Sequence, residues 1–220
     1  VMDRLYLYDT TLRDGQQTQG VQFSAAEKTE IAGMLDQLGV DHIEGGWPGA
    51  NPTDSDFFAA APRTRATMTA FGMTKRAGRS AENDEVLAAV LNAGTSSVCL
   101  VGKTHPFHVH EALGITLDEN LENIRASVAH LVASGREALF DAEHFFDGYA
   151  DNPDYALTCL RTALDAGARW VVLCDTNGGT LPARVAKVTR AVIASGIPGD
   201  RLGIHCHDDT GNAVACTLAA

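Results

Sequence analysis

Long apolar runs are missing from this sequence of 220 residues. No stretch approaches the roughly 18 consecutive apolar residues that a transmembrane helix requires, and no apolar region of signal-peptide type follows the first residues. We therefore expect neither a membrane span nor secretion, and we predict a cytoplasmic protein. Proline is also scarce, at 7 residues, and no linker-like segment divides the chain. We expect one domain over residues 1–220.

Basic residues are also few, with 17 Lys and Arg against 28 Asp and Glu and a formal net charge of −11. The acidic residues are spread along the chain, so nucleic-acid binding is not expected. An anionic substrate would need a local positive group, such as an arginine or a metal ion. The five cysteines show no CxxC spacing and fit reduced thiols in a cytoplasm.

A repeated change from helical to strand periodicity is present instead. Amphipathic stretches end at five glycines, and an apolar strand-like stretch follows each one: Gly39, Gly94, Gly135, Gly167 and Gly196. Ser24 and Thr116, each with Glu three residues later, predict helix N-termini. With residues 5–8 and 67–71 added, strands are predicted to start near residues 5, 42, 67, 97, 137, 170 and 202. The spacing of about 33 residues is the size of a βα unit.

Alternating strands and helices favour a parallel sheet, either a closed (β/α)8 barrel or an open doubly wound sheet. No GxGxxG follows the first strand, which weakens the dinucleotide-binding form of the open sheet. Polar residues follow many strands, and in a barrel these positions converge on one face. We therefore predict an α/β fold, the (β/α)8 TIM barrel. Eight units need roughly 260 residues, so we expect a barrel truncated after about seven βα units.

Two strand ends carry the residue types of a metal site. The run at 5–8 leads into Arg13 and Asp14, and the run at 202–204 leads into His205 and His207. Alternate residues on a strand share a face, so the two histidines point the same way. An isolated HxH is more often structural, but together with Asp14 it offers one oxygen and two nitrogens to a divalent ion. A 2-oxo acid could fill the open positions, and Arg13 would supply a fixed cation.

Other polar residues at strand ends have both structural and functional interpretations. Glu143, with Asp141 on the same face, is either a solvated strand end or an acid that orients a ligand. Thr176 either binds a carboxylate or belongs to a turn. Glu44 ends the second strand. The basic segment after the fourth strand is either a second metal site or an exposed loop, and it contains Lys103, His105, His108 and His110.

Two longer signatures resemble those of a known family. The first is Leu12-Arg13-Asp14-Gly15-x-Gln17 with Lys28, and the second runs from Leu202 through His205-x-His207-Asp208-Asp209 to Ala215. Both are similar to signatures of the condensing enzymes of the 2-isopropylmalate, homocitrate and citramalate synthase group. The segments 44–54 and 144–149 look most like those of the citramalate synthases.

The resemblance implies a catalytic TIM barrel with a metal site. Asp14, His205 and His207 would hold Mg²⁺, Mn²⁺ or Zn²⁺. Matching motif positions imply that Arg13 polarises the ketone and that Glu143 and Thr176 line the pocket. We accordingly predict Arg13 and Glu143 as catalytic residues, and we predict a substrate-binding set of Arg13, Glu44, Asp141 and Thr176.

The implied activity is that of an acyltransferase of the EC 2.3.3 type. It would condense acetyl-CoA, as co-substrate, with a 2-oxo acid, and pyruvate would give citramalate and CoA in branched-chain amino acid biosynthesis. The alternatives are a 2-isopropylmalate or homocitrate synthase, a C–C lyase of the HMG-CoA lyase kind on the same barrel, and a non-catalytic fragment that only binds. The family continues into an eighth strand and a C-terminal regulatory region. We expect both to be absent here, and the exposed sheet edges to pair in a homodimer.

Overall fold

The computed structural model describes residues 4–60 and 63–220, and the strands in these residues form one parallel sheet. The strands pair in chain order from β1 to β7. Their bounds are β1 Tyr8–Asp9, β2 His42–Gly46, β3 Thr67–Met73, β4 Ser97–Lys103, β5 Glu137–Glu143, β6 Trp170–Asp175 and β7 Leu202–Cys206. The predicted starts of all strands after the first are confirmed.

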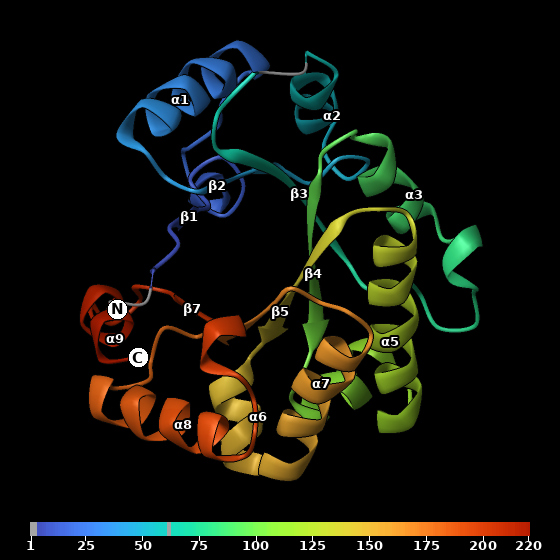
Figure 1. Ribbon diagram of the computed structural model, residues 1–220, viewed down its shortest axis with the longest axis vertical. Helices are drawn as coiled ribbons and strands as arrows, with labels where there is room; N and C mark the ends of the chain where they lie inside the picture. Colours follow the sequence, from blue (N-terminus) through green and yellow to red (C-terminus); the bar gives the residue numbers. More distant parts are fainter. Residues whose placement is uncertain (1–3, 61–62) are drawn as a thin grey trace.

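Helices connect successive strands and cover the outer face of the curled sheet (Figure 1). The α-helices are α1 Ala25–Leu38, α2 Pro52–Ala59, α3 Glu85–Asn92, α4 Pro106–His108, α5 Leu117–Ala133, α6 Phe145–Asp151, α7 Pro153–Asp165, α8 Pro182–Ala194 and α9 Ala213–Ala219. Short helical turns are η1 Gly15–Gln17, η2 Ala81–Asn83, η3 Val109–Leu113 and η4 Gly199–Arg201. A doubly wound sheet would carry helices on both faces, so the prediction of a truncated barrel is confirmed.

The first strand is shorter than predicted. The apolar run at 5–8 predicted a buried strand, but β1 begins only at Tyr8, and the exposed fractions of Leu5 and Leu7 are 86% and 60%. The Leu7 carbonyl already accepts hydrogen bonds from the amides of Asp41 and His42. In the part of the chain that the structure describes, β1 pairs with β2 alone. Leu5 and Leu7, just before β1, therefore have no neighbouring strand on the second side and stay exposed.

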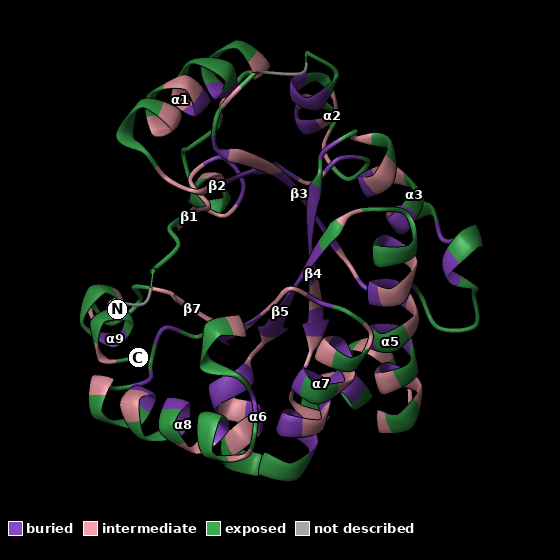
Figure 2. Cartoon of the chain, viewed as in Figure 1, coloured by how far each residue is buried: buried purple, intermediate pink, exposed green. Residues whose placement is uncertain are grey.

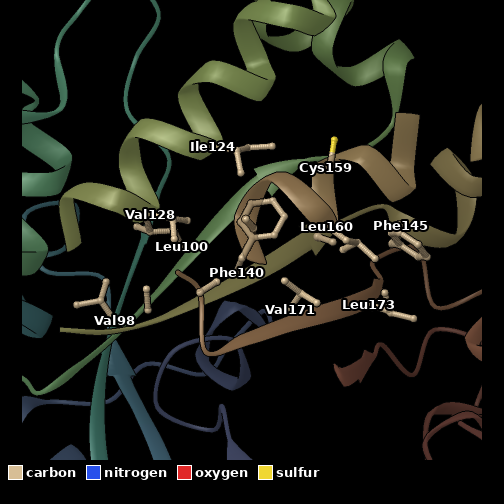
Figure 3. Close-up of a cluster of buried hydrophobic side chains, with 14 of the residues drawn as sticks. Val98, Leu100, Ile124, Val128, Phe140, Phe145, Cys159, Leu160, Val171 and Leu173 are labelled. Atoms are coloured by element: carbon tan, nitrogen blue, oxygen red, sulfur yellow. The ribbon is translucent and has the colours of Figure 1, made fainter. Parts of the chain in front are cut away.

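Side chains alternate between the two faces of each strand. Val98 and Leu100 pack in the outer core with side chains of α5 and α7 (Figure 3). Cys99, which lies between them, packs in a separate inner cluster with Phe71 and Leu139. Figure 2 shows the buried residues on the strands and on the inner surfaces of the helices. Burial on both faces is the normal state of a parallel sheet.

Local signals set the helix ends. Ser24 forms a capping box with Glu27 at the start of α1, and Thr116 accepts the Glu119 amide at the start of α5. Gly39 ends α1 with a φ of 91°, a left-handed conformation that favours glycine. None of the helices in residues 4–60 and 63–220 has both the length and the apolarity that a bilayer crossing demands.

Candidate metal and substrate site

Asp14 and two histidines meet at the carboxyl ends of the first and last described strands. Asp14 follows β1, His205 lies in β7, and His207 directly follows that strand. Asp14 Oδ2 lies 3.1 Å from His205 Nε2 and 3.1 Å from His207 Nε2. One ligand atom from each residue lies within 4.8 Å of the others. The structure therefore brings together the three residues that the sequence suggests as metal ligands.

The three side chains support one another electrostatically. Burial acts to raise the pKa of Asp14, but hydrogen bonds to the two histidines and the charge of Arg13 hold it well below its usual value. Burial acts to lower the pKa of His205, yet the hydrogen bond to Asp14 and nearby carboxylates leave it raised. The hydrogen bond to Asp14 is also the main reason that the pKa of His207 is raised. Asp14 is therefore a carboxylate at neutral pH, the form that binds a cation.

The donor set fits a divalent ion. A carboxylate oxygen and two imidazole nitrogens suit Zn²⁺ or Mn²⁺, and three protein ligands leave coordination positions open. The side chains of Asp14, His205 and His207 have exposed fractions of 18%, 20% and 34%. An ion and a ligand can therefore reach the cluster from the mouth of the barrel.

Arg13 is held rigidly beside these three residues. Its Nε donates to Glu44 Oε1 at 2.5 Å, and its guanidinium carbon lies 3.8 Å from the ring centre of Phe71. The Tyr8 hydroxyl donates to the other Glu44 oxygen at 2.5 Å. Arg13 Nη1 lies 3.6 Å from Asp14 Oδ1. The guanidinium is a fixed positive charge next to Asp14 and the two histidines.

Glu44 is completely buried, and this burial destabilises its charged form. Burial raises the pKa of Glu44, whereas the positive charge of Arg13 acts in the opposite direction. Burial acts to lower the pKa of Arg13, but the charges of Glu44 and Asp14 leave it raised. Glu44 therefore acts through Arg13, because its carboxylate positions the guanidinium through a charge-assisted hydrogen bond.

Asp141 lies one layer deeper in the barrel than Glu143. Its Oδ2 is 4.0 Å from His205 Nδ1, and the residue is 6% exposed. Burial raises the pKa of Asp141, and the nearby His205 and Arg13 oppose this effect. Metal-binding histidines commonly have a carboxylate near their second nitrogen. Asp141 occupies that position relative to His205.

Glu143 forms one wall of a cavity. It lies in register with Lys103 on the neighbouring strand, and Lys103 Nζ is 2.5 Å from Glu143 Oε2. Both residues line a cavity of about 160 Å³, with Met73, Val101 and Leu113 among its apolar walls. Glu143 is therefore paired and oriented inside the mouth, unlike an acid at a freely solvated strand end.

Thr176 follows β6 at the rim of the same mouth. Its hydroxyl oxygen accepts the backbone amide of His144 at 2.8 Å. His144 has a φ of 55°, a left-handed conformation that is unusual for a residue other than glycine. This contact fixes the position of Thr176 while leaving its hydroxyl hydrogen for a ligand.

The histidine-rich loop after β4 gives no support to a second metal site. The ring of His108 lies 4.9 Å from that of His105 and 4.1 Å from that of His144, centre to centre. Within residues 4–60 and 63–220, no group of three converging metal ligands includes them. His110 is exposed and contacts the Ile115 carbonyl. Lys103 differs from this loop because it points into the cavity.

Sequence reasoning assigned no role to Tyr8, and it named Lys28 only as part of the first signature. Tyr8 holds Glu44, and the signal for it was an aromatic residue on the inward face at the end of a strand. Lys28 is fully buried and forms an ion pair with Asp54, and it donates to the Gly45 carbonyl at 2.9 Å. Its position four residues before buried Ala32 placed it on the inner face of α1.

A family model described as HMGL-like matches residues 4–220. The chain belongs to the HMGL-like family. It is 52% identical to an (R)-citramalate synthase of Streptomyces coelicolor over 222 residues, which cover 99% of this chain and 41% of that protein. It is 33% identical to a 2-isopropylmalate synthase of Staphylococcus carnosus, over 100% of this chain and 42% of that protein. The resemblance to this group of synthases is confirmed, and the chain spans about two fifths of the length of these relatives.

Solved structures of the family agree with the fold. The structure matches an HMG-CoA lyase of Bacillus subtilis with a TM-score of 0.81, at 18% sequence identity. The match covers 98% of this chain and 72% of that one. At this identity the likeness shows the barrel architecture.

Proposed function

We propose that the protein of which this chain is the barrel condenses acetyl-CoA with a 2-oxo acid, and that the acid is pyruvate. The observation that carries the proposal is the meeting of Asp14, His205 and His207 with Arg13 at one mouth. The identity of 52% to an (R)-citramalate synthase supports pyruvate as the acid. The acetyl methyl carbon would lose a proton and bond to the ketone carbon, and water would then hydrolyse the thioester to give citramalate and CoA.

Arg13 and Glu143 would have different roles in a Claisen-type condensation. A bound Mg²⁺, Mn²⁺ or Zn²⁺ would supply Lewis-acid polarisation of the ketone. Arg13 places a permanent positive charge where negative charge develops on the ketone oxygen, which is a form of electrostatic catalysis. Glu143, held by Lys103, is positioned to accept or donate a proton at the mouth.

The substrate-binding set has two kinds of members. Arg13 and Thr176 would contact the 2-oxo acid, through its oxygens and its carboxylate respectively. Glu44 and Asp141 would not touch the acid. Glu44 would position Arg13, and Asp141 would orient His205. The apolar wall of the 160 Å³ cavity would receive the side chain of the acid.

The cellular location and the partners of the protein follow from this proposal. Residues 1–220 would form the catalytic barrel of a cytoplasmic biosynthetic enzyme. Its partners would be the two small substrates. Residues 1–220 on their own would also pair with a second copy, because the edges of β1 and β7 can pair with other strands. Neither nucleic acid nor a membrane is a proposed partner.

A 2-isopropylmalate synthase activity is the second candidate, supported by the relative at 33% identity. It would use a bulkier 2-oxo acid in the same cavity. Calorimetric titration with pyruvate and with 2-oxoisovalerate, in the presence of Mn²⁺, separates the two functions. Stronger binding of pyruvate supports the proposal, and stronger binding of 2-oxoisovalerate supports the alternative.

A second experiment measures CoA release from acetyl-CoA by the full-length protein. Glu143→Gln should lower the rate by about 100-fold, the typical loss of a general acid or base. Glu137→Gln, at the opposite end of the same strand, is the matched control and should keep the wild-type rate. The proposal fails if the wild-type protein releases no CoA with any 2-oxo acid.

A further inference from the structure

A second group of converging metal-ligand atoms lies in the interior of the barrel. Its members are Asp141 in β5, Cys174 in β6 and His205 in β7, and one ligand atom from each lies within 4.8 Å of the others. We propose that these three residues bind a thiophilic divalent ion of the Zn²⁺ or Cd²⁺ class, and that this ion competes with the catalytic ion for His205. The inference goes beyond the proposed function, because it concerns a second ion.

The three residues lie on neighbouring strands and face the barrel interior. β5, β6 and β7 pair side by side, and Cys174 lies in register with His205. Asp141 lies two residues after Leu139, which packs in the inner cluster, so the two side chains share a face. Asp141 and Cys174 are 6% and 7% exposed. The paired strands therefore hold the candidate ligands in a largely dry environment.

The Asp141 carboxyl group is buried with weak partners. Within residues 4–60 and 63–220, no amide or hydroxyl donates a hydrogen bond to it, and its ion-pair partner, His205 Nδ1, is 4.0 Å away. The Cys99 thiol also interacts with it, but a thiol is a weak donor. Buried carboxylates are normally paired or bind a metal ion. A cation bound between Asp141 and its neighbours would compensate for the burial of this carboxylate.

The donor set favours a thiophilic ion over Mn²⁺. It offers one sulfur, one nitrogen and one oxygen atom, and Zn²⁺ binds cysteine, histidine and aspartate in tetrahedral sites. Mn²⁺ prefers oxygen ligands and gains little from a thiolate. Burial raises the pKa of the Cys174 thiol, so this residue carries its proton while the ion is absent. As the sulfur–metal bond forms, the S–H bond breaks and the proton passes to solvent.

His205 couples the two ion sites, because its two ring nitrogens lie near different acids. Nε2 lies 3.1 Å from Asp14 Oδ2, and Nδ1 lies 4.0 Å from Asp141 Oδ2. A neutral imidazole has one nitrogen free to bind an ion and keeps its proton on the other. An ion bound to Nδ1 therefore leaves the Nε2 hydrogen for Asp14 and removes His205 from the ligands at the mouth. Binding of the thiophilic ion and of the catalytic ion is consequently competitive.

The test is a titration of the 220-residue chain with Cd²⁺, followed by the ultraviolet charge-transfer absorption of cadmium–thiolate bonds. The wild-type chain should gain this absorption, and Cys174→Ser should lose it. Cys159→Ser, which changes a buried thiol of α7, is the matched control and should keep it. Added Mn²⁺ should reduce the absorption of the wild type, because the two ions compete for His205.

The assignment is overturned if the wild-type chain shows no charge-transfer absorption. Unchanged absorption in Cys174→Ser also overturns it, because the ion would then be bound by another thiol, such as the half-buried Cys206. Circular dichroism shows whether Cys174→Ser is folded. If it is not, the wild type still decides the question, since absorption that Mn²⁺ does not reduce contradicts the shared use of His205. None of these measurements uses acetyl-CoA or a 2-oxo acid, so their outcome is separate from that of the proposed function.

Discussion

His207 Nε2 lies 3.1 Å from Asp14 Oδ2, although 193 residues separate the two in the chain. Asp14 follows the first strand of the described sheet and His207 follows the last. These two strands are not paired with each other, and Figure 1 shows the curled sheet open between them. The proposed metal ligands thus join the two edges of the sheet through side chains. An ion bound there should stabilise the fold as well as the substrate.

Mn²⁺ should therefore raise the melting temperature of the chain, and Asp14→Asn should abolish the effect. At a concentration of about 100 times Kd, a ligand that binds only the folded state adds about 2.7 kcal/mol of stability. For a chain of this size that corresponds to a rise of roughly 5–10 °C in Tm. Thermal unfolding followed by circular dichroism measures it. Asp209→Asn, an exposed acid near the site, serves as control and should keep the full rise. An undiminished rise in Asp14→Asn would place the ion elsewhere.

The metal-free protein should lose stability as the pH increases above about 6.5, the pKa of an unfolded histidine. The hydrogen bonds to Asp14 raise the pKa of His205 and His207 above that of an unfolded histidine, about 6.5. Their contribution is complete below the unfolded pKa and is lost as the pH passes the raised pKa of the folded state. Metal binding needs neutral imidazoles, so the affinity for Mn²⁺ should increase over the same range.

Thermal unfolding in EDTA and in Mn²⁺, at several pH values, tests both trends. The variant His205→Asn/His207→Asn should show a smaller dependence of Tm on pH in EDTA. His110→Ala, which changes an exposed histidine, should behave like the wild type. Identical pH dependence in all three proteins would mean that the pairing with Asp14 contributes no stability.

Lys28→Met should destabilise the protein by about 3–5 kcal/mol, because it leaves the buried Asp54 carboxylate without its charged partner. Replacing both partners, as Lys28→Met/Asp54→Leu, should cost less than the single change. Urea unfolding gives both values. Arg125→Met breaks an exposed ion pair to Glu122 and should have little effect. A double variant that is less stable than the single variant would contradict this account of the ion pair.

The sequence was most informative where a residue's role depends on its own strand or helix. Gly39 and the apolar stretch that follows Gly94 each act within one βα unit, so they predicted the order of the elements correctly. The prediction of the first strand was wrong because burial at residues 5–8 depends on a neighbouring strand at the sheet edge. An apolar run contains no information about whether that neighbour is present.

The candidate site was harder to predict because its supporting contacts join distant segments. Asp14 and the two histidines could be paired from the sequence, since parallel strands end on one face. The ion pair of Lys103 with Glu143 depends on the register of β4 and β5, and Lys103 was consequently grouped with an exposed loop. A cavity of about 240 Å³ beside Arg13, lined also by Gln16 and Asn51, depends on how the β1–α1 and β2–α2 connections pack together, which no local pattern encodes.

Asp141→Asn should separate two possible roles for this buried acid. Asp141 Oδ2 lies 4.0 Å from His205 Nδ1. A carboxylate there orients the ring and strengthens it as a ligand, and loss of such a partner typically costs 10- to 100-fold in metal affinity. We therefore expect Mn²⁺ to bind at least about tenfold more weakly to Asp141→Asn by calorimetry.

Cys99→Ser, which changes a neighbour of Asp141 on the adjacent strand, is the control and should retain wild-type affinity for Mn²⁺. If Asp141→Asn binds Mn²⁺ normally but loses pyruvate, the carboxylate contacts the substrate directly and does not act through His205. Binding of pyruvate at saturating Mn²⁺ distinguishes the two roles, because a weakened metal site is then filled and only a direct substrate contact remains visible.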